Sequence, residues 1–159
     1  MDIGKLSNKL GFSVNKIMVL TDENKDKGFT ELRDGSITLA SNLDAEIVSY
    51  DKSAISYLVN PYPSELHQKE YNKPLTQPEL LVMGRQYLAD EIRLYDSFGV
   101  KAKAILPTDH GFAHLASWAK KEEADIIMIP SSLVRPGLVS RLQGYTLDSL
   151  MAATDIPVL

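Results

Sequence analysis

The sequence predicts an α/β protein whose five-stranded parallel sheet carries helices on both faces. Short, almost unbroken apolar runs alternate along the chain with segments in which apolar residues recur every three to four positions. Apolar runs of this kind are typical of strands buried on both faces. Their strict alternation with helices indicates right-handed βαβ units that build a parallel sheet.

The apolar runs predict the strands in order. Four complete strands are expected at residues 16–21, 45–50, 101–106 and 125–129. A fifth is expected to begin at Ile156 and to include Pro157, Val158 and Leu159.

Helical periodicity predicts four helices between these strands. The first covers residues 32–43, although Asp34 and Gly35 weaken its first half. The second is expected to run continuously over residues 80–95 and to stop at Gly99. The third covers residues 112–119 with Thr108 or Asp109 as its N-cap, and the last covers residues 147–151 with Thr146 as its N-cap.

Two segments stand outside this alternation. Residues 1–14 are of mixed composition and are expected to form an N-terminal extension. Residues 51–78 contain four prolines and three tyrosines, and are expected to form a long loop. Loops of this length in a compact domain usually serve as lids or partner surfaces, so we expect a protein partner here. The remainder fits a single domain spanning residues 1–159.

Composition and charge exclude several classes of function. The formal net charge is −4, from 17 basic and 21 acidic residues, with no cluster of Lys and Arg that would suit a nucleic-acid phosphate backbone. There is no cysteine, so disulfides and thiolate chemistry are excluded. The sequence has no signal peptide and no apolar run of about 20 residues. We therefore expect a cytoplasmic protein without a membrane or nucleic-acid partner.

Residues at the carboxyl ends of the strands are the candidates for a ligand site. Ligands of open parallel sheets bind beyond these ends, where the strand order reverses. Asp22 follows the first predicted strand, and Pro130, Ser131 and Ser132 follow the fourth. Asp22 and the serines are also residue types that cap turns and helix starts, so a purely structural role is the competing interpretation.

The stretch from Ala124 to Gly144 resembles the C-terminal half of universal stress proteins, and residues 16–22 resemble their first strand and the acidic residue after it. This resemblance implies a Rossmann-like open α/β/α sandwich and a homodimer paired through the last strand. Many members of the family bind ATP through a glycine loop after the fourth strand. That loop reads Gly, two residues, Gly, nine residues, then Gly-Ser or Gly-Thr. Glycines let backbone N–H groups approach phosphate oxygens.

This chain departs from the family's glycine pattern at three of four points. Pro130 replaces the first glycine and removes an N–H, and Leu133 or Val134 replaces the second. Gly144 matches the third, but Tyr145 follows it in place of the small hydroxyl residue. The usual geometry of ATP binding is therefore disfavoured, and loss of nucleotide binding is the first functional hypothesis: a non-catalytic regulatory or interaction protein.

The second hypothesis is an adenine-nucleotide site of modified geometry. Ser131, Ser132 and Arg135 would hold a phosphate, with Gly137, Gly144 and the helix start at Thr146 beside it. Asp22 matches the family's acidic residue near the adenosine. The ligand would be ATP or AMP, with or without Mg²⁺, and slow ATP hydrolysis would be compatible with this hypothesis.

No other chemistry gains comparable support. His110 and His114 lie four residues apart, but no glutamate stands between them and no third ligand is evident, so a zinc site is disfavoured. A phosphoacceptor receiver domain would use Asp22 and Glu23, but it also needs an aspartate at the end of the third strand, where Leu106 stands. No catalytic or metal-binding residue is therefore predicted.

Overall fold

The computed structural model describes residues 13–22, 27–52, 73–107, 109, 111–134, 141–142 and 144–159. The strands within these ranges are β1 (Lys16–Thr21), β2 (Glu46–Asp51), β3 (Ala102–Ile105) and β4 (Ile126–Met128). The helices are α2 (Lys27–Leu43), α5 (Gln77–Val82), α6 (Gln86–Ser97), α7 (Phe112–Lys121), α9 (Leu147–Ala153) and the short 3₁₀ helix η1 (Ser131–Val134).

The four strands form one parallel sheet in the order β3-β2-β1-β4. Ile17 in the central strand β1 lies opposite Ile47 of β2 and Ile126 of β4. Receiver-type sheets have the order 2-1-3-4-5, in which the first and third strands are neighbours. Here β2 separates β1 from β3, so the structure contradicts the receiver-domain alternative.

The prediction of five strands was wrong by one. The segment after Thr154 approaches β4 in parallel, but only Val158 forms a bridge, with Ile127. Three backbone hydrogen bonds hold it there: Ile127 N–H to Pro157 O, Leu159 N–H to Ile127 O, and Ile129 N–H to Leu159 O. Pro157 contributes no N–H to a ladder, so the segment forms a rudimentary edge to the sheet and not a full strand.

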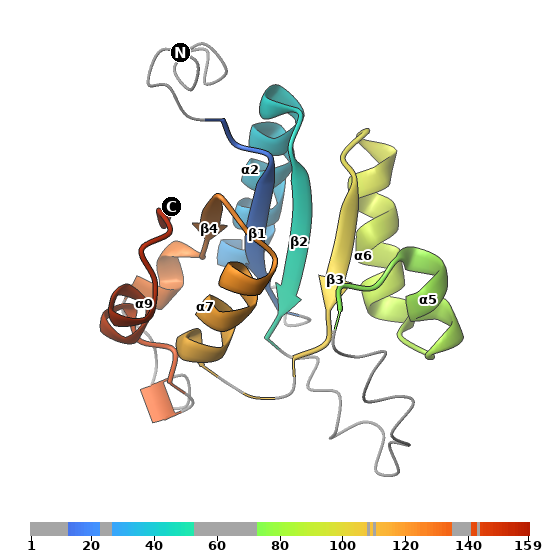
Figure 1. Ribbon diagram of the computed structural model, residues 1–159. Coiled ribbons are helices and arrows are strands. Elements are labelled where there is room, and N and C mark those ends of the chain that lie inside the picture. Colours follow the sequence, from blue (N-terminus) through green and yellow to red (C-terminus); the bar gives the residue numbers. More distant parts are fainter. Residues whose placement is uncertain are drawn as a thin grey trace.

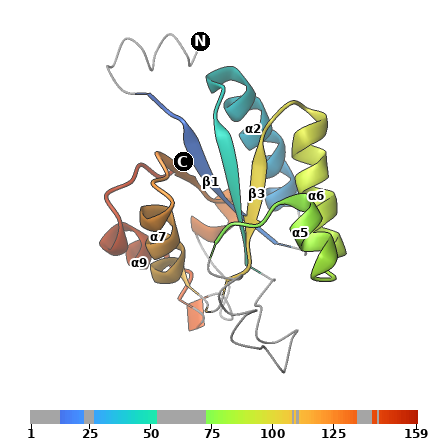
Figure 2. The ribbon, with the colours of Figure 1, turned by 45° about the vertical axis from the view of Figure 1, so that its right-hand side comes forward.

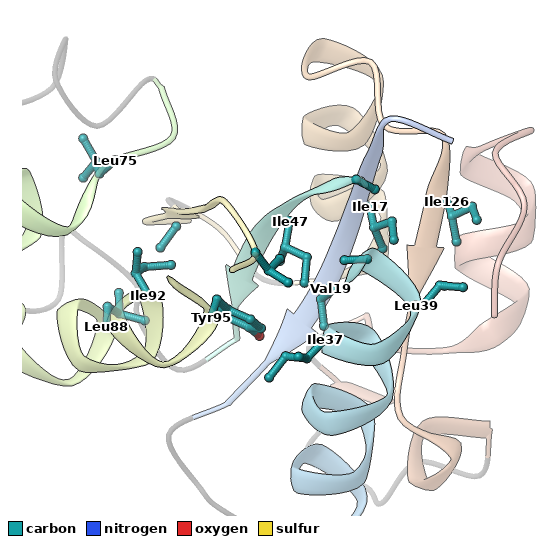
Figure 3. Close-up of a cluster of buried hydrophobic side chains, with 14 of the residues drawn as sticks. Ile17, Val19, Ile37, Leu39, Ile47, Leu75, Leu88, Ile92, Tyr95 and Ile126 are labelled. Carbon is teal, nitrogen blue, oxygen red and sulfur yellow. The ribbon is translucent and has the colours of Figure 1, made fainter. Parts of the chain in front are cut away.

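Helices cover both faces of the sheet, as the sequence predicted. Figures 1 and 2 show α2 and α6 on one face and α7 and α9 on the other. Alternate residues of β1 divide between them: Ile17 and Val19 belong to the core beneath α2 and α6, whereas Met18 and Leu20 belong to the core beneath α7 and α9. Figure 3 shows the first of these cores. Both are built from side chains that are almost wholly buried.

The helix predicted over residues 80–95 is in fact two helices. It breaks between α5 and α6 at Gly84, which has φ +74°. The Gly84 N–H donates to Leu81 O and the Arg85 N–H donates to Leu80 O, which is the hydrogen-bond pattern of a Schellman helix end. The left-handed backbone at Gly84 therefore ends the helix, although the apolar periodicity continues across it.

Other boundaries were predicted with mixed success. The first helix is continuous over 17 residues despite Asp34 and Gly35. The third helix was assigned the wrong cap: its N-cap is Gly111, with φ 101°, and neither Thr108 nor Asp109, and no side chain caps it. The stop near Gly99 is confirmed by its φ of +75°.

The two segments set apart in the sequence are shorter than predicted. Asp51 belongs to β2, and Gln77 and Pro78 belong to α5, so the predicted 51–78 loop is too long at both ends. Val14, assigned to the N-terminal extension, is only 6% exposed and is part of the core. Residues 1–12 and 53–72 lie outside the described ranges. Among the described helices, none combines the length and the apolar character that crossing a bilayer requires.

Candidate functional site

The strand order places the candidate site between β1 and β4. From β1 the chain continues to β2 and β3 on one side, and it then crosses to β4 on the other side. The strand order therefore reverses between β1 and β4, where ligands bind in open α/β sheets. Asp22 follows β1, Lys52 follows β2 and Pro130 follows β4 at this edge.

Asp22 is held from two directions. Its carboxylate Oδ2 lies 3.9 Å from Lys52 Nζ, and both side chains are about 15% exposed or less. Its backbone carbonyl accepts a hydrogen bond of 3.0 Å from the Tyr87 hydroxyl on α6. The Lys52 N–H donates to Thr21 O at 2.7 Å, which extends the pairing of β1 and β2 beyond the strands and fixes Lys52 beside Asp22.

Tyr145 fills the space next to this ion pair. Its side chain is fully buried, and its ring meets Phe112 edge to face at 5.3 Å. Lys52 Nζ lies 4.8 Å from the ring centre, within the range of a cation–π contact. In the resemblance seen in the sequence, Gly144 and Tyr145 stand at the positions at which the universal stress protein motif has Gly-Ser or Gly-Thr. A large aromatic side chain is thus buried where that motif has a small hydroxyl.

The electrostatic surroundings of Tyr145 are acidic. Burial is the main cause that raises the pKa of its phenol to about 12; the carboxylates of Asp22, Asp109 and Asp51 act in the same direction, and a hydrogen bond with the Gly111 backbone acts in the opposite one. The phenol therefore stays neutral near neutral pH, since ionisation would add a negative charge beside existing ones. A phosphate at this position would meet the same repulsion.

Asp51 is a fully buried carboxylate at the end of β2. The Thr21 hydroxyl lies 3.3 Å from Asp51 Oδ2 and 2.8 Å from the Ser49 hydroxyl, so the ends of β1 and β2 share a hydrogen-bonded cluster. Buried charges need such partners because desolvation is costly. The sequence placed residues 50–53 at this edge of the sheet, but neither Asp51 nor Lys52 was selected as a site residue. Their position directly after an apolar run was the available signal.

A second cluster of interacting side chains joins the end of β2 to the segment after β3 and to α7. The Tyr50 hydroxyl donates to the Asp109 carbonyl at 3.3 Å, and the Tyr50 ring meets His114 at 6.2 Å in an edge-to-face arrangement. Burial lowers the pKa of His114, and the Asp109 charge partly opposes that effect. His110, the other member of the predicted histidine pair, lies outside the described residues. His114 thus belongs to an aromatic contact.

Gly144 and Thr146 have structural roles of their own. Gly144 has φ +83°, and a Cβ there would lie 3.4 Å from the Cα of Gly111. Its carbonyl accepts from the Phe112 N–H at 3.1 Å and from the Ser149 hydroxyl at 3.0 Å. Thr146 is the N-cap of α9, as predicted, because its hydroxyl accepts from the Ser149 N–H at 3.3 Å. These contacts give Gly144 and Thr146 structural roles in the turn before α9.

Only the first part of the segment after β4 lies within the described residues. Pro130 is buried and its carbonyl accepts from the Leu133 N–H at 3.1 Å, which starts η1. Ser131 is exposed at the start of η1, and no polar contact joins its side chain to Asp22 or Thr146 in the described part of the chain. The Ser132 side chain, Arg135 and Gly137 lie outside the described residues.

A small cavity of about 20 Å³ lies beside Asp22. Its other lining residues come from β1, α2 and α6: Thr21, Phe29, Thr30, Arg33, Tyr87 and Glu91. That volume suits a water molecule, whereas sites for cofactor-sized ligands measure about 300–1,000 Å³. This particular cavity is therefore too small for a nucleotide.

The comparisons with known proteins agree with the architecture. No family model and no curated protein matches the sequence. Solved structures do match, and three are representative. A universal stress protein family member from Burkholderia pseudomallei is 17% identical, with a TM-score of 0.53 over 89% of this chain and 92% of its own.

Two further matches have nucleotides in their structures. One is the universal stress protein from Archaeoglobus fulgidus in complex with dAMP, 12% identical, with a TM-score of 0.55 over 91% of this chain and 95% of its own. The other is a universal stress protein family protein from Arabidopsis thaliana with AMP bound, 13% identical, with a TM-score of 0.51 over 91% and 88%. This chain has the fold of the universal stress proteins, which confirms the resemblance seen in the sequence at the level of the fold.

Proposed function

We propose that this protein is a non-catalytic regulatory or interaction protein of the universal stress protein type that does not use a nucleotide as its ligand. The observation that carries the proposal is the buried Tyr145 ring beneath Lys52 at the point of strand reversal. In the family motif this point belongs to the phosphate-binding loop. Here the chain's own side chains fill it.

Three features work against a bound triphosphate. Pro130 lacks the N–H that a phosphate oxygen would accept from. The ammonium of Lys52 is engaged with Asp22 and with the Tyr145 ring. The Thr146 hydroxyl is already the acceptor for the helix cap. A nucleotide that used Lys52 would have to displace these Lys52 contacts before it gained its own, and binding energy would be lost in doing so.

Adenine-nucleotide binding is the second candidate, and two observations favour it. Asp22 stands directly after β1, where the family motif has its acidic residue. Two proteins of the same fold have dAMP or AMP bound. In this alternative Tyr145 swings away from the edge, and Ser131, Ser132 and Arg135 supply the phosphate contacts.

Assembly and location complete the proposal. We expect a cytoplasmic homodimer that pairs through residues 157–159, because this segment lies at the outer side of β4 and binds it through only three backbone hydrogen bonds. Strand edges of this kind are templates for pairing with a second chain. A protein partner at the 51–78 segment remains a prediction, since residues 53–72 lie outside the described ranges.

A thermal-shift titration with AMP and with ATP plus Mg²⁺ tests the proposed function. A ligand at a hundred times its dissociation constant adds about 2.7 kcal/mol of stability, which moves the melting temperature by several degrees. We expect no shift with millimolar nucleotide. A shift that is lost in Asp22→Ala, but kept in a variant of the exposed Asp148, would establish the second candidate in its place.

A further inference from the structure

A cavity of about 450 Å³ lies beside β3, where residues of α5 and α6 complete its lining. Figure 1 shows these three elements next to one another. The antiparallel contact of Leu75 with Ala104 places Thr76 opposite Lys103, so the chain itself fills the position next to Lys103 and bounds the cavity there. The volume is within the range of small-molecule sites. The remaining space thus suits a small molecule and not an added strand.

The apolar wall of the cavity lies on one face of the sheet. Ala102 and Ile92 both belong to the core between the sheet and the helices α2 and α6. Lys103 stands opposite Val48, whose side chain belongs to the core on the other face, so the Lys103 ammonium is directed away from this wall. The same alternation applies to the other charged lining residues next to β2 and β3, which are Glu46 and Lys101. The charged side chains on the side of the apolar wall are therefore those of α6.

Arg93 and Asp96 are the two charged residues that α6 contributes to the cavity. They are three positions apart, so they lie on one face of the helix with about 5–6 Å between their Cβ atoms. Ile92 is four positions before Asp96 and lies on the same face. Both charged side chains are exposed, and neither forms an ion pair or a hydrogen bond with another described residue. A guanidinium and a carboxylate thus stand side by side at an apolar wall.

This combination of groups defines the chemistry of a ligand. A guanidinium binds a carboxylate through two parallel hydrogen bonds, and a carboxylate binds an ammonium. A ligand with only a carboxylate would be repelled by Asp96, and one with only an ammonium would be repelled by Arg93. The ligand therefore carries both charges close together, with an apolar group beside them for Ile92, Pro78 and Ala102. Exposed pairs between Arg93 and Asp96 themselves are weak, so such a ligand displaces little.

We propose that this cavity binds a free α-amino acid with an apolar side chain, of the leucine type. The carboxylate of the ligand pairs with Arg93, its ammonium pairs with Asp96, and its side chain packs against Ile92 and Pro78. The amide of Gln77 lines the cavity from α5 and provides a further hydrogen-bond donor for the carboxylate. Because Arg93 and Asp96 are exposed, each ion pair adds only modestly to the affinity, which we expect to be millimolar.

The amino-acid site extends the regulatory role, because it adds a small molecule to which such a protein could respond. It concerns a different part of the sheet from the nucleotide question: the cavity adjoins β3, whereas the strand order reverses between β1 and β4. Failure of amino-acid binding would leave the nucleotide titration unaffected, and the reverse also holds. The two proposals can therefore fail independently.

Backbone amide chemical shifts recorded during titration with L-leucine test the proposal, since they report both the affinity and the place of binding. We expect saturable shifts at Ile92, Arg93, Asp96 and Ala102. Three analogues each lack one feature: 4-methylpentanoate has no ammonium, 3-methylbutylamine has no carboxylate, and glycine has no side chain. Each should bind at least about threefold more weakly than leucine, which is the ratio expected when one exposed ion pair or one apolar contact is lost.

Two variants on α6 test the assignment of the charges. Arg93→Gln and Asp96→Asn should each weaken leucine binding about threefold or more. Asp96→Asn should bind 4-methylpentanoate no more weakly than the wild type does, because this analogue has no ammonium to lose. The matched control is Asp90→Asn, which removes the same charge from an exposed position of α6 that does not line the cavity, and it should leave leucine binding unchanged.

Three results would overturn the proposal. The first is the absence of saturation at tens of millimolar leucine. The second is equal affinity for leucine and for the two analogues that each lack a charge, which would show that Arg93 and Asp96 do not recognise a zwitterion. The third is an equal effect of Asp96→Asn and Asp90→Asn on leucine binding. The melting temperatures of the variants confirm that each protein is folded before its affinity is compared.

Discussion

The ammonium of Lys52 lies 4.8 Å from the centre of the Tyr145 ring, so the residue that follows β2 covers the residue that follows Gly144. The same ammonium lies 3.9 Å from the carboxylate of Asp22. One lysine thus connects the ends of β1 and β2 with the segment before α9. This contact lies at the carboxyl edge of the sheet, where the strand order reverses between β1 and β4.

Replacing Lys52 tests that contact directly. Lys52→Met should lower the free energy of unfolding by about 1 kcal/mol, because a partly buried cation–π contact and an ion pair are lost together. Urea denaturation measures the change. Lys52→Arg should retain most of the stability, and Lys120→Met, at an exposed position, should change it by less than about 0.5 kcal/mol. Equal changes in the free energy of unfolding for Lys52→Met and Lys120→Met would show that the Lys52 contacts do not stabilise the protein.

Alkaline titration tests the surroundings of Tyr145. Its folded-state pKa is raised to about 12 against about 10 in the unfolded chain. Between these values the unfolded chain has lost a proton that the folded protein keeps, so stability is complete below pH 10 and falls as the pH rises toward 12. Tyr145→Phe should remove that part of the loss, up to about 3 kcal/mol.

Urea midpoints of wild type and Tyr145→Phe at pH 9 and pH 11 measure this effect. Burial also raises the pKa of Tyr50 and Tyr95, so some alkaline destabilisation should persist in the variant. Parallel losses in the two proteins would show that the Tyr145 phenol titrates normally.

A matched pair of glycine substitutions tests the backbone at the site. Gly144→Ala should destabilise the protein by more than about 1 kcal/mol, since φ is +83° and the new Cβ would meet the Gly111 backbone. Gly35→Ala should instead stabilise it by about 0.5–1 kcal/mol, because Gly35 lies within α2 and a Cβ there meets nothing within 4 Å. Thermal unfolding distinguishes these opposite signs.

The buried carboxylate of Asp51 provides a further test. Thr21→Val removes a hydroxyl that lies within hydrogen-bond distance of both Asp51 and Ser49, while it keeps the shape of the side chain. The expected loss is about 1–3 kcal/mol, because buried polar groups lose a partner. Thr38→Val on the exposed face of α2 is the control and should be nearly neutral. Similar values for the two variants would argue against the cluster at the ends of β1 and β2.

Sequence patterns were sufficient to predict the central strands of the sheet, because the positions of these strands depend on burial. The apolar runs at residues 16–21 and 45–50 match β1 and β2 within a residue, since strands covered on both faces need apolar side chains at every position. The fifth strand was wrong because apolar character alone does not reveal how many ladder bonds a segment will form. Pro157 was the one signal against it.

Helix boundaries were less accessible because local backbone conformation decided them. Apolar periodicity runs across Gly84 without interruption, yet the positive φ there separates α5 from α6. Gly111 replaces a side-chain cap at the start of α7 for a similar reason. The sequence alone does not reveal the φ angle of either glycine.

The candidate site was predicted only in part. Asp22, Gly144 and Thr146 were found from a motif, and the structure gives each a defined local contact. Lys52 and Asp51 were missed because their importance comes from register: they share one edge with Tyr145 only after β2 pairs with β1. Tyr145 appeared in the sequence as a departure from a pattern, and only the fold shows that its ring is buried.

Calorimetric titration of the wild-type protein with AMP, and with ATP plus Mg²⁺, is the most direct measurement of whether a nucleotide binds at the edge between β1 and β4. The account predicts no saturable heat up to millimolar nucleotide, because Tyr145 and the Lys52–Asp22 pair fill the edge between β1 and β4. A dissociation constant in the micromolar range with a stoichiometry near one per chain would contradict it.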